Sequence, residues 1–304
     1  MINTLLEIMY ILTGLIAIAT GIYAIKDKEH TKKLGTGLFW VLFGVIFIGG
    51  EKIPPYIVGG IIVFMGILTS LKMVGAGSQK NSSEKYRIEK SNTIGNMLFL
   101  PALSIGIIAF AVAQFTKLGG LVGLGIGSII AIILTLIVTK EKPKYIGYDS
   151  SRMLQQIGAT TILPQLLTAL GALFTVAGVG NVIADLIGSV VPQGNILAGV
   201  VVYCLGMAIF TMIMGNAFAA FAVITAGIGI PFVFSQGANP AIAGILGLTA
   251  GYCGTLLTPM GANFNIVPAA IMEMENKNGV ILAQIPVAGA MLLVHILLMY
   301  FWAF

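Results

Sequence analysis

The chain has 304 residues, of which 58% are apolar and only 9% are charged, with 39 glycines and a mean hydropathy of +1.01. Because a soluble fold carries about 25% charged residues, this composition excludes soluble enzymes and nucleic-acid-binding proteins and predicts an all-α integral membrane protein. The formal net charge of +5 arises from basic residues in a few short loops, which indicates membrane topology rather than a polyanion partner. The lipid bilayer is therefore the expected surroundings.

Five apolar runs in the first half of the chain are long enough to act as membrane spans, since a spanning helix takes about 20 residues. They cover residues 7–25, 36–50, 55–71, 97–115 and 121–139. The first run follows a short tail without a basic region and has no small-residue cleavage site. We therefore expect it to stay as a helix rather than to be removed as a signal peptide.

The basic residues between these runs predict the orientation. Thirteen of the sixteen Lys and Arg residues fall in alternate loops, at positions 26–33, 72–90 and 140–152, whereas Lys52 and Lys117 stand alone in the loops between them. Cytoplasmic loops are enriched in Lys and Arg. The N-terminus is thus expected outside and the 139–156 loop in the cytoplasm.

The second half lacks uniform spans, because residues 186–272 contain no charged side chain and are broken by polar stretches. We expect one helix over 157–187 that ends in the turn-rich stretch 191–195, and a last helix from about residue 280. Between them, the runs 196–214 and 218–234 are joined at 215–217, and the run 241–270 is interrupted at 258–265.

The runs 196–214 and 218–234 are either two full spans or the arms of a re-entrant hairpin, and charge does not decide between them. Their short arms and tight, uncharged link favour the hairpin. The predicted architecture is a polytopic helical bundle of about eight transmembrane helices, one re-entrant hairpin and one broken helix, with both termini outside. Residues 1–156 form a scaffold-like region and residues 157–304 a transport-like region.

The two breaks are the candidate site, because unsatisfied backbone groups in hydrocarbon survive only where protein buries them or a cavity surrounds them. Glycine permits a sharp reversal, proline stops a helix, and Asn and Thr supply neutral polar groups. Freed carbonyls suit a cation, and a helix N-terminus suits a carboxylate. The candidate residues for binding substrate or ion are Gly215, Asn216, Ala217, Thr258, Pro259, Gly261, Asn263 and Asn265. The neighbouring Thr255 is expected to be a contact between helices.

No catalytic constellation is evident, so we do not expect an enzyme. His30 lies in a predicted loop, His295 stands alone in the last helix, and Asp185 lies near a predicted helix end. Cys204 and Cys253 lie in apolar runs and are expected to be packing residues. No metal centre and no cofactor are expected, apart from Na⁺ as a coupling ion.

A helix, a hairpin with an Asn tip and a helix broken at Thr-Pro-Met-Gly-Ala-Asn together resemble one repeat of the ion transporter superfamily of elevator-type carriers. Across nearly the whole chain the sequence more narrowly resembles a bacterial membrane family, domain of unknown function 979, which is linked to 5-oxoproline (pyroglutamate) uptake. The stretches that carry this resemblance are 162–165 with 178–180, 215–221 (Gly-Asn-Ala-Phe-Ala-Ala-Phe) and 254–263 (Gly-Thr-Leu-Leu-Thr-Pro-Met-Gly-Ala-Asn).

The resemblance implies a multi-pass protein of the bacterial inner membrane that works with a second, smaller membrane subunit. The superfamily's Ser-Asn-Thr tip falls on Gly215, Asn216 and Ala217, so only the Asn matches. Its carriers build one site from two inverted halves. This chain shows one hairpin and one broken helix, so a partner is expected to supply the other half.

Two functions remain open from the sequence. The first is a secondary transporter subunit for a small carboxylate, suggested to be 5-oxoproline, with ion coupling. The second is a non-transporting scaffold or assembly subunit, in which the breaks are packing devices. Convergence of Asn216 and Asn263 on one pocket would favour the transporter.

Overall fold

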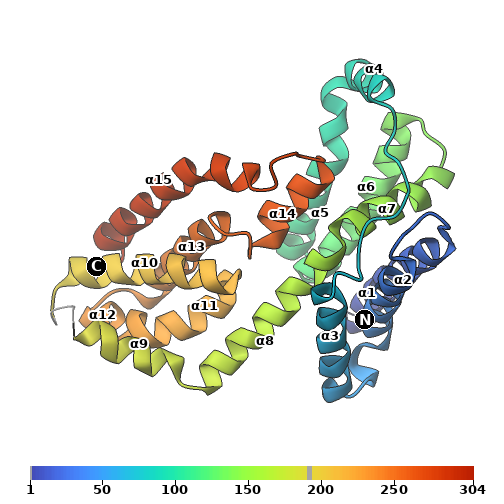
Figure 1. The fold of residues 1–304 in the computed structure, drawn as a ribbon. Helices are drawn as coiled ribbons and strands as arrows, with labels where there is room; N and C mark the ends of the chain where they lie inside the picture. Colours follow the sequence, from blue (N-terminus) through green and yellow to red (C-terminus); the bar gives the residue numbers. More distant parts are fainter. Residues whose placement is uncertain (1, 190–193) are drawn as a thin grey trace. The chain divides into compact units, whose positions relative to one another are not determined.

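The computed structural model describes residues 2–189 and 194–304, and in this part of the chain every regular element is a helix (Figure 1). The chain divides into two compact units, Met1–Gly158 and Ala159–Phe304. Most of the predicted turn at 191–195 lies outside the described residues. The predicted all-α, polytopic membrane fold is confirmed.

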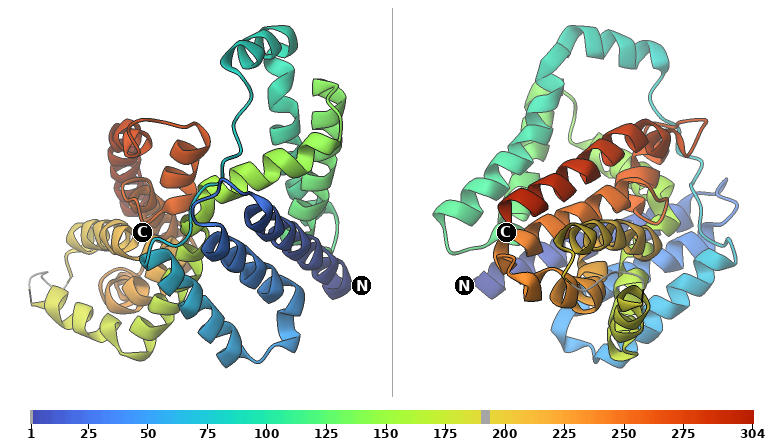
Figure 2. Two further views of the ribbon diagram at one scale, coloured as in Figure 1. Left: turned by 45° about the vertical axis from the view of Figure 1, so that its right-hand side comes forward. Right: turned by 90° about the vertical axis from the view of Figure 1, so that its left-hand side faces the viewer.

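The first unit begins with two antiparallel helices in close contact, α1 and α2 (Figures 1 and 2). A Cβ built on Gly14 of α1 would lie 2.7 Å from the Gly44 carbonyl oxygen, and one built on Gly44 of α2 would lie 2.5 Å from the Gly14 carbonyl oxygen. Small residues that let two backbones approach are a common basis of helix association in membranes. The helical elements of this unit are α1 (Ile2–Lys26), α2 (Lys33–Gly49), η1 (Gly50–Lys52), α3 (Pro55–Ser70), α4 (Glu84–Ile94), η2 (Gly95–Phe99), α5 (Leu100–Phe115), α6 (Gly120–Thr139) and α7 (Lys144–Ile157).

A polar cluster outside the predicted spans holds the segment after α3 against the loop after α1. The Ser78 N–H donates to Asp27 Oδ2 at 2.7 Å, and the Ser78 hydroxyl donates to Asp27 Oδ1 at 2.8 Å. Buried His30 accepts from the Lys32 N–H at Nδ1, 3.1 Å away. The hydrogen bond from the Ser78 N–H lowers the pKa of Asp27, and burial lowers the pKa of His30.

The second unit is built around α10 and α13, which pack against α15 and α11. Tyr203 of α10 is fully buried, and its ring lies where a Cβ on Gly247 of α13 would sit. Its hydroxyl is 2.8 Å from the Thr225 hydroxyl in the π-helical segment. The elements are η3 (Gly158–Ile162, across the boundary), α8 (Leu163–Val176), α9 (Val179–Gly188), α10 (Ile196–Met214), α11 (Ala217–Ile224), η4 (Thr225–Gly229), α12 (Ile230–Phe232), η5 (Phe234–Gln236), α13 (Pro240–Leu256), α14 (Ala262–Ile271) and α15 (Gly279–Trp302).

Two sequence expectations about these elements are wrong, and two of the predicted loops contain helices. The single helix over 157–187 is two helices, α8 and α9, because Gly178 has a left-handed backbone with φ +71°. The predicted loop over 139–156 contains the helix α7, and α4 occupies part of the loop between the third and fourth runs. The interruption at 258–265 is narrower than expected, because α14 already begins at Ala262.

The helix lengths leave the number of membrane crossings open. Among the described residues six helices are long and apolar enough to cross a membrane, or seven if Lys144–Ile157 and Thr160–Val176 form one span. α2, α3 and α13 are apolar but have only 17, 16 and 17 residues. The segments Ile196–Met214 and Ala217–Gln236 each meet the length criterion. The count of eight spans and the choice between re-entrant hairpin and two spans therefore stay predictions.

Candidate functional site

The hairpin tip reverses the chain within two residues. α10 ends at Gly215, whose φ of +65° is left-handed, and Asn216 returns to an extended backbone. The Asn216 side chain accepts a hydrogen bond from the Phe218 N–H at 2.9 Å, which caps the start of α11. The Asn216 side-chain oxygen thus has a structural role, and the side-chain nitrogen is left to bind other groups.

The broken helix is held open by two buried polar residues. The Thr258 hydroxyl donates to the Met212 carbonyl of α10 at 2.9 Å, which ties the break to the hairpin. Asn265, which is fully buried in α14, donates from Nδ2 to the carbonyls of Thr255 at 2.9 Å and Thr258 at 2.6 Å. The first bond supplies a donor to a carbonyl in the last turn of α13, and the second joins the Gly261 N–H at the Thr258 carbonyl in the break.

The tip and the break meet at a pocket of about 230 Å³. Asn216 and Asn263 both line it. Its wall also includes three aromatic side chains, of which Phe218 and Tyr252 pack edge to face with ring centroids 6.0 Å apart. The described lining residues are Pro164, Gly215, Asn216, Ala217, Phe218, Tyr252, Thr255, Met260, Gly261, Ala262, Asn263 and Phe264.

Two helix N-termini contribute to this pocket. Ala217 and Phe218 open α11, whereas Ala262 and Asn263 open α14. The first N–H groups of a helix have no intrahelical acceptor, and the helix dipole places partial positive charge there. No Lys, Arg, Asp, Glu or His is among the described residues that line the pocket. The pocket is therefore weakly positive through backbone groups alone, which suits one negative charge.

Three buried side-chain oxygens near the pocket have no hydrogen-bond partner in the described chain: Thr211 Oγ1, Thr255 Oγ1 and Asn265 Oδ1. Thr255 lines the pocket, and Asn265 is bonded to the Thr255 carbonyl. Thr211 lies one turn before the tip, since its carbonyl accepts from the Gly215 N–H at 2.7 Å. Buried oxygens without a donor are unfavourable unless water or a cation binds them.

The eight predicted site residues fall into two groups. Gly215, Asn216, Ala217, Gly261 and Asn263 line the pocket, whereas Thr258 and Asn265 are buried beside it and Pro259 is exposed on the break. Sequence reasoning missed Tyr252 and Phe264, and it assigned Thr255 only to helix packing. The spacing of three between Tyr252 and Thr255 places both on one helix face and could have indicated them.

The remaining polar residues singled out from the sequence lie elsewhere. Asp185 is exposed on α9, and it is not among the described residues that line the pocket. His295 is buried in α15, with Nδ1 2.7 Å from the Met291 carbonyl oxygen. Cys204 and Cys253 are buried and free, and the Cys204 sulfur lies 4.0 Å from that of Met299.

The fold and this pocket define a multi-pass, all-α membrane protein with a helical hairpin seated on a broken helix. Residues 7–304 match the family described as Protein of unknown function (DUF979), and the chain belongs to this family. No curated protein and no solved structure matches the chain.

Proposed function

We propose that this protein is one subunit of a secondary transporter of the bacterial inner membrane that binds a small carboxylate, with 5-oxoproline as the suggested substrate. The observation that carries the proposal is the convergence of Asn216 and Asn263 on one pocket where two helix N-termini meet. The resemblance to a family linked to 5-oxoproline uptake and to elevator-type carriers supplies the suggested substrate class.

The chemistry of the pocket supports a compact monoanion. A volume of about 230 Å³ is below the range of about 300–1,000 Å³ typical of sites for drug-sized ligands. The N–H groups at the starts of α11 and α14 would bind the carboxylate. The Asn216 amide nitrogen can donate to the lactam oxygen of 5-oxoproline, and the Asn263 amide can donate to and accept from the lactam. Phe218, Tyr252 and Phe264 offer an apolar wall for its ring.

Sodium is the coupling ion that the donor set favours. Neutral hydroxyl, amide and backbone oxygens are suitable ligands for a hard cation. Thr211, Thr255 and Asn265 each hold a buried oxygen next to the pocket that receives no hydrogen bond from the part of the chain that the structure describes. A bound Na⁺ would also offset the negative charge of the substrate in a site that has no charged side chain of its own.

A second membrane subunit completes the proposal. The described residues contribute one hairpin tip and one broken helix, whereas carriers of the class that the chain resembles enclose the substrate between two such halves. Polar groups at membrane depth need a facing polar surface. We expect a smaller subunit with a hairpin of its own to provide it.

Uptake of radiolabelled 5-oxoproline by cells that lack their own uptake system tests this function. Cells that express both subunits should accumulate the label in sodium medium and lose most uptake when sodium is replaced by choline. Cells that express this chain alone should show background uptake. Failure of every subunit combination to accumulate the label, with both subunits shown to be in the membrane, would favour the scaffold role instead.

A further inference from the structure

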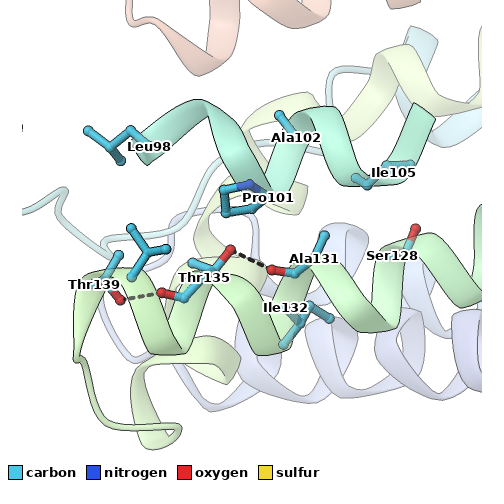
Figure 3. A pocket seen from close by; sticks show the side chains of 10 residues that line it. Leu98, Pro101, Ala102, Ile105, Ser128, Ala131, Ile132, Thr135 and Thr139 are labelled. Carbon is cyan, nitrogen blue, oxygen red and sulfur yellow. Dashed lines mark hydrogen bonds between the residues drawn. The ribbon is translucent and has the colours of Figure 1, made fainter. Parts of the chain in front are cut away.

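A second cavity lies in the first unit, in the groove between α5 and α6, and the transporter site does not use it. Its volume is about 420 Å³, and it is lined by one face of α5 with the preceding turn, from Leu98 to Ile105, and one face of α6, from Ser128 to Thr139. Figure 3 shows the lining residues on the two neighbouring helices. Eleven residue steps along α6 correspond to a length of about 16 Å.

The floor of the groove is apolar apart from three hydroxyls whose protons are already donated. The three hydroxyls that line it donate within α6. Thr135 and Thr139 donate to the carbonyls of Ala131 and Thr135, each at 2.7 Å (Figure 3), and Ser128 donates to the Leu124 carbonyl at 2.8 Å. The remaining lining residues are Leu, Pro, Ala, Ile and Val. The lining therefore favours an apolar occupant.

The dimensions of the groove favour a slender occupant over a helix. A helix is about 10–12 Å across with its side chains, so a 16 Å length of it would occupy on the order of 1,500 Å³. The cavity holds about 420 Å³. A helix could only lie over the groove, whereas a single hydrocarbon chain could lie within it along its length.

One end of the groove opens next to a basic cluster. The lining residue Thr139 is followed by Lys140, and Lys90 Nζ lies 3.4 Å from the Thr139 carbonyl oxygen. Residues 84–90 and 140–144 together hold six Lys or Arg residues and three Glu, a net charge of +3. The opposite end of the α5–α6 hairpin has only Lys117.

The cluster is ordered but not neutralised. Glu141 accepts from the Tyr86 hydroxyl and from Lys90 Nζ, which lies 2.9 Å away, so this carboxylate is already engaged. Lys140 and Lys142 are exposed and form no ion pair within the described residues. Their charges remain available for an anion at the mouth of the groove.

We propose that the α5–α6 groove is a binding site for an anionic phospholipid, with one acyl chain in the groove and the phosphate headgroup at Lys140 and Lys142. The occupant must be apolar along about 16 Å and negatively charged at one end, which an anionic phospholipid of the adjoining leaflet satisfies. The lipid would hold α5 and α6 together. Among the described residues of α5 only Ser104 is buried, so little of this helix is covered by the protein itself.

The test uses the full-length protein purified in detergent and titrated with lipid under native mass spectrometry. Phosphatidylglycerol should bind more tightly than phosphatidylcholine with the same acyl chains. Because each basic residue near a membrane surface strengthens the attraction to anionic lipid by a factor of about five, Lys140→Asn with Lys142→Gln should weaken phosphatidylglycerol binding about 25-fold. Asn is chosen at position 140 because the Lys140 backbone is left-handed, with φ +56°.

Two matched controls make the result specific. Lys117→Gln, at the other end of the same hairpin, should leave binding of phosphatidylglycerol unchanged. Ala102→Phe fills the groove and should abolish binding of the tightly held lipid, whereas Ala113→Phe, on the same helix outside the groove, should not. The substitutions of the exposed lysines still test the proposal if the Ala102→Phe variant does not fold. Equal binding of the two lipids would overturn the proposal. Equal effects of Lys117→Gln and of the substitutions at the lysine pair would overturn it as well.

Discussion

The backbone of Gly215 lies directly against the Met260 carbonyl: a Cβ built on Gly215 would stand 2.5 Å from the Met260 oxygen and 2.7 Å from Leu167 Cδ1. The tip of the hairpin is thereby fitted to the break in the neighbouring helix, and no side chain is accommodated between them. This contact joins the two polar interruptions into one pocket.

Replacement of Gly215 should disrupt that contact. In Gly215→Ala the left-handed backbone costs about 1–2 kcal/mol, and the clash with the Met260 carbonyl adds about 1–3 kcal/mol. Gly237→Ala is the matched control, since Gly237 has a φ of +103° but no atom within 4 Å of the place that a Cβ would take. Thermal unfolding in detergent should show the larger loss for Gly215→Ala; equal losses would mean that the contact is unimportant.

The two asparagines of α14 should separate stability from transport. Asn265→Ala removes the side-chain donor to the Thr255 and Thr258 carbonyls, and Thr258 keeps the Gly261 N–H as a donor. The loss of the donor to the Thr255 carbonyl should cost about 1–3 kcal/mol. It should lower the unfolding temperature clearly. Asn263→Ala, at an exposed position that lines the pocket, should leave the unfolding temperature unchanged and abolish uptake. A stable Asn265→Ala protein would contradict this division of roles.

Acid should loosen the polar cluster of the first unit. The pKa of Asp27 lies below its ordinary value of 3.8, chiefly through the Ser78 N–H, so the ionised form stabilises the fold above that value. The stabilisation is lost as the pH falls through the lowered pKa. Buried His30, whose pKa lies below 6.5, acts in the same direction, because its charging opposes folding. Both contributions are therefore present at neutral pH.

Hydrogen exchange at the Ser78 amide measures this effect. At neutral pH, Asp27→Asn should exchange Ser78 faster than the unchanged protein, because the amide then donates to a neutral oxygen. The difference should vanish once the pH falls well below 3.8. Equal protection in both proteins at neutral pH would show that Asp27 does not hold this segment.

Much of the fold follows from the chain's apolar runs. α1 and α6 match runs bounded by charged loops, and both candidate breaks are visible as Gly, Pro and Asn within charge-free stretches. The end of α8 is not visible in the sequence, because Gly178 is one of many glycines in apolar surroundings. Its positive φ is known only from the structure. The helix α7 was missed because its polar, charged sequence resembles a loop.

The candidate site was recognisable only in outline. Asn216 and Asn263 could be predicted as site residues because polar side chains at membrane depth are energetically costly and are often functional. The different roles of Asn263, which lines the pocket, and Asn265, which is buried, depend on the face of α14 that each occupies. The sequence pattern did not show these faces, because α14 begins earlier than the pattern suggested. The contribution of Tyr252 depends on the contact between α13 and α11, which no local pattern contains.

The most direct test of the account is the charge at residue 216, measured as uptake of radiolabelled 5-oxoproline by cells that express the complete transporter. Asn216→Ser and Asn216→Asp both keep a side chain that caps α11, so both should assemble and remain stable. Asn216→Asp places a negative charge where the carboxylate is expected to bind. The account predicts that Asn216→Asp abolishes uptake while Asn216→Ser retains a measurable part of it; uptake by Asn216→Asp at the level of the unchanged protein would contradict it.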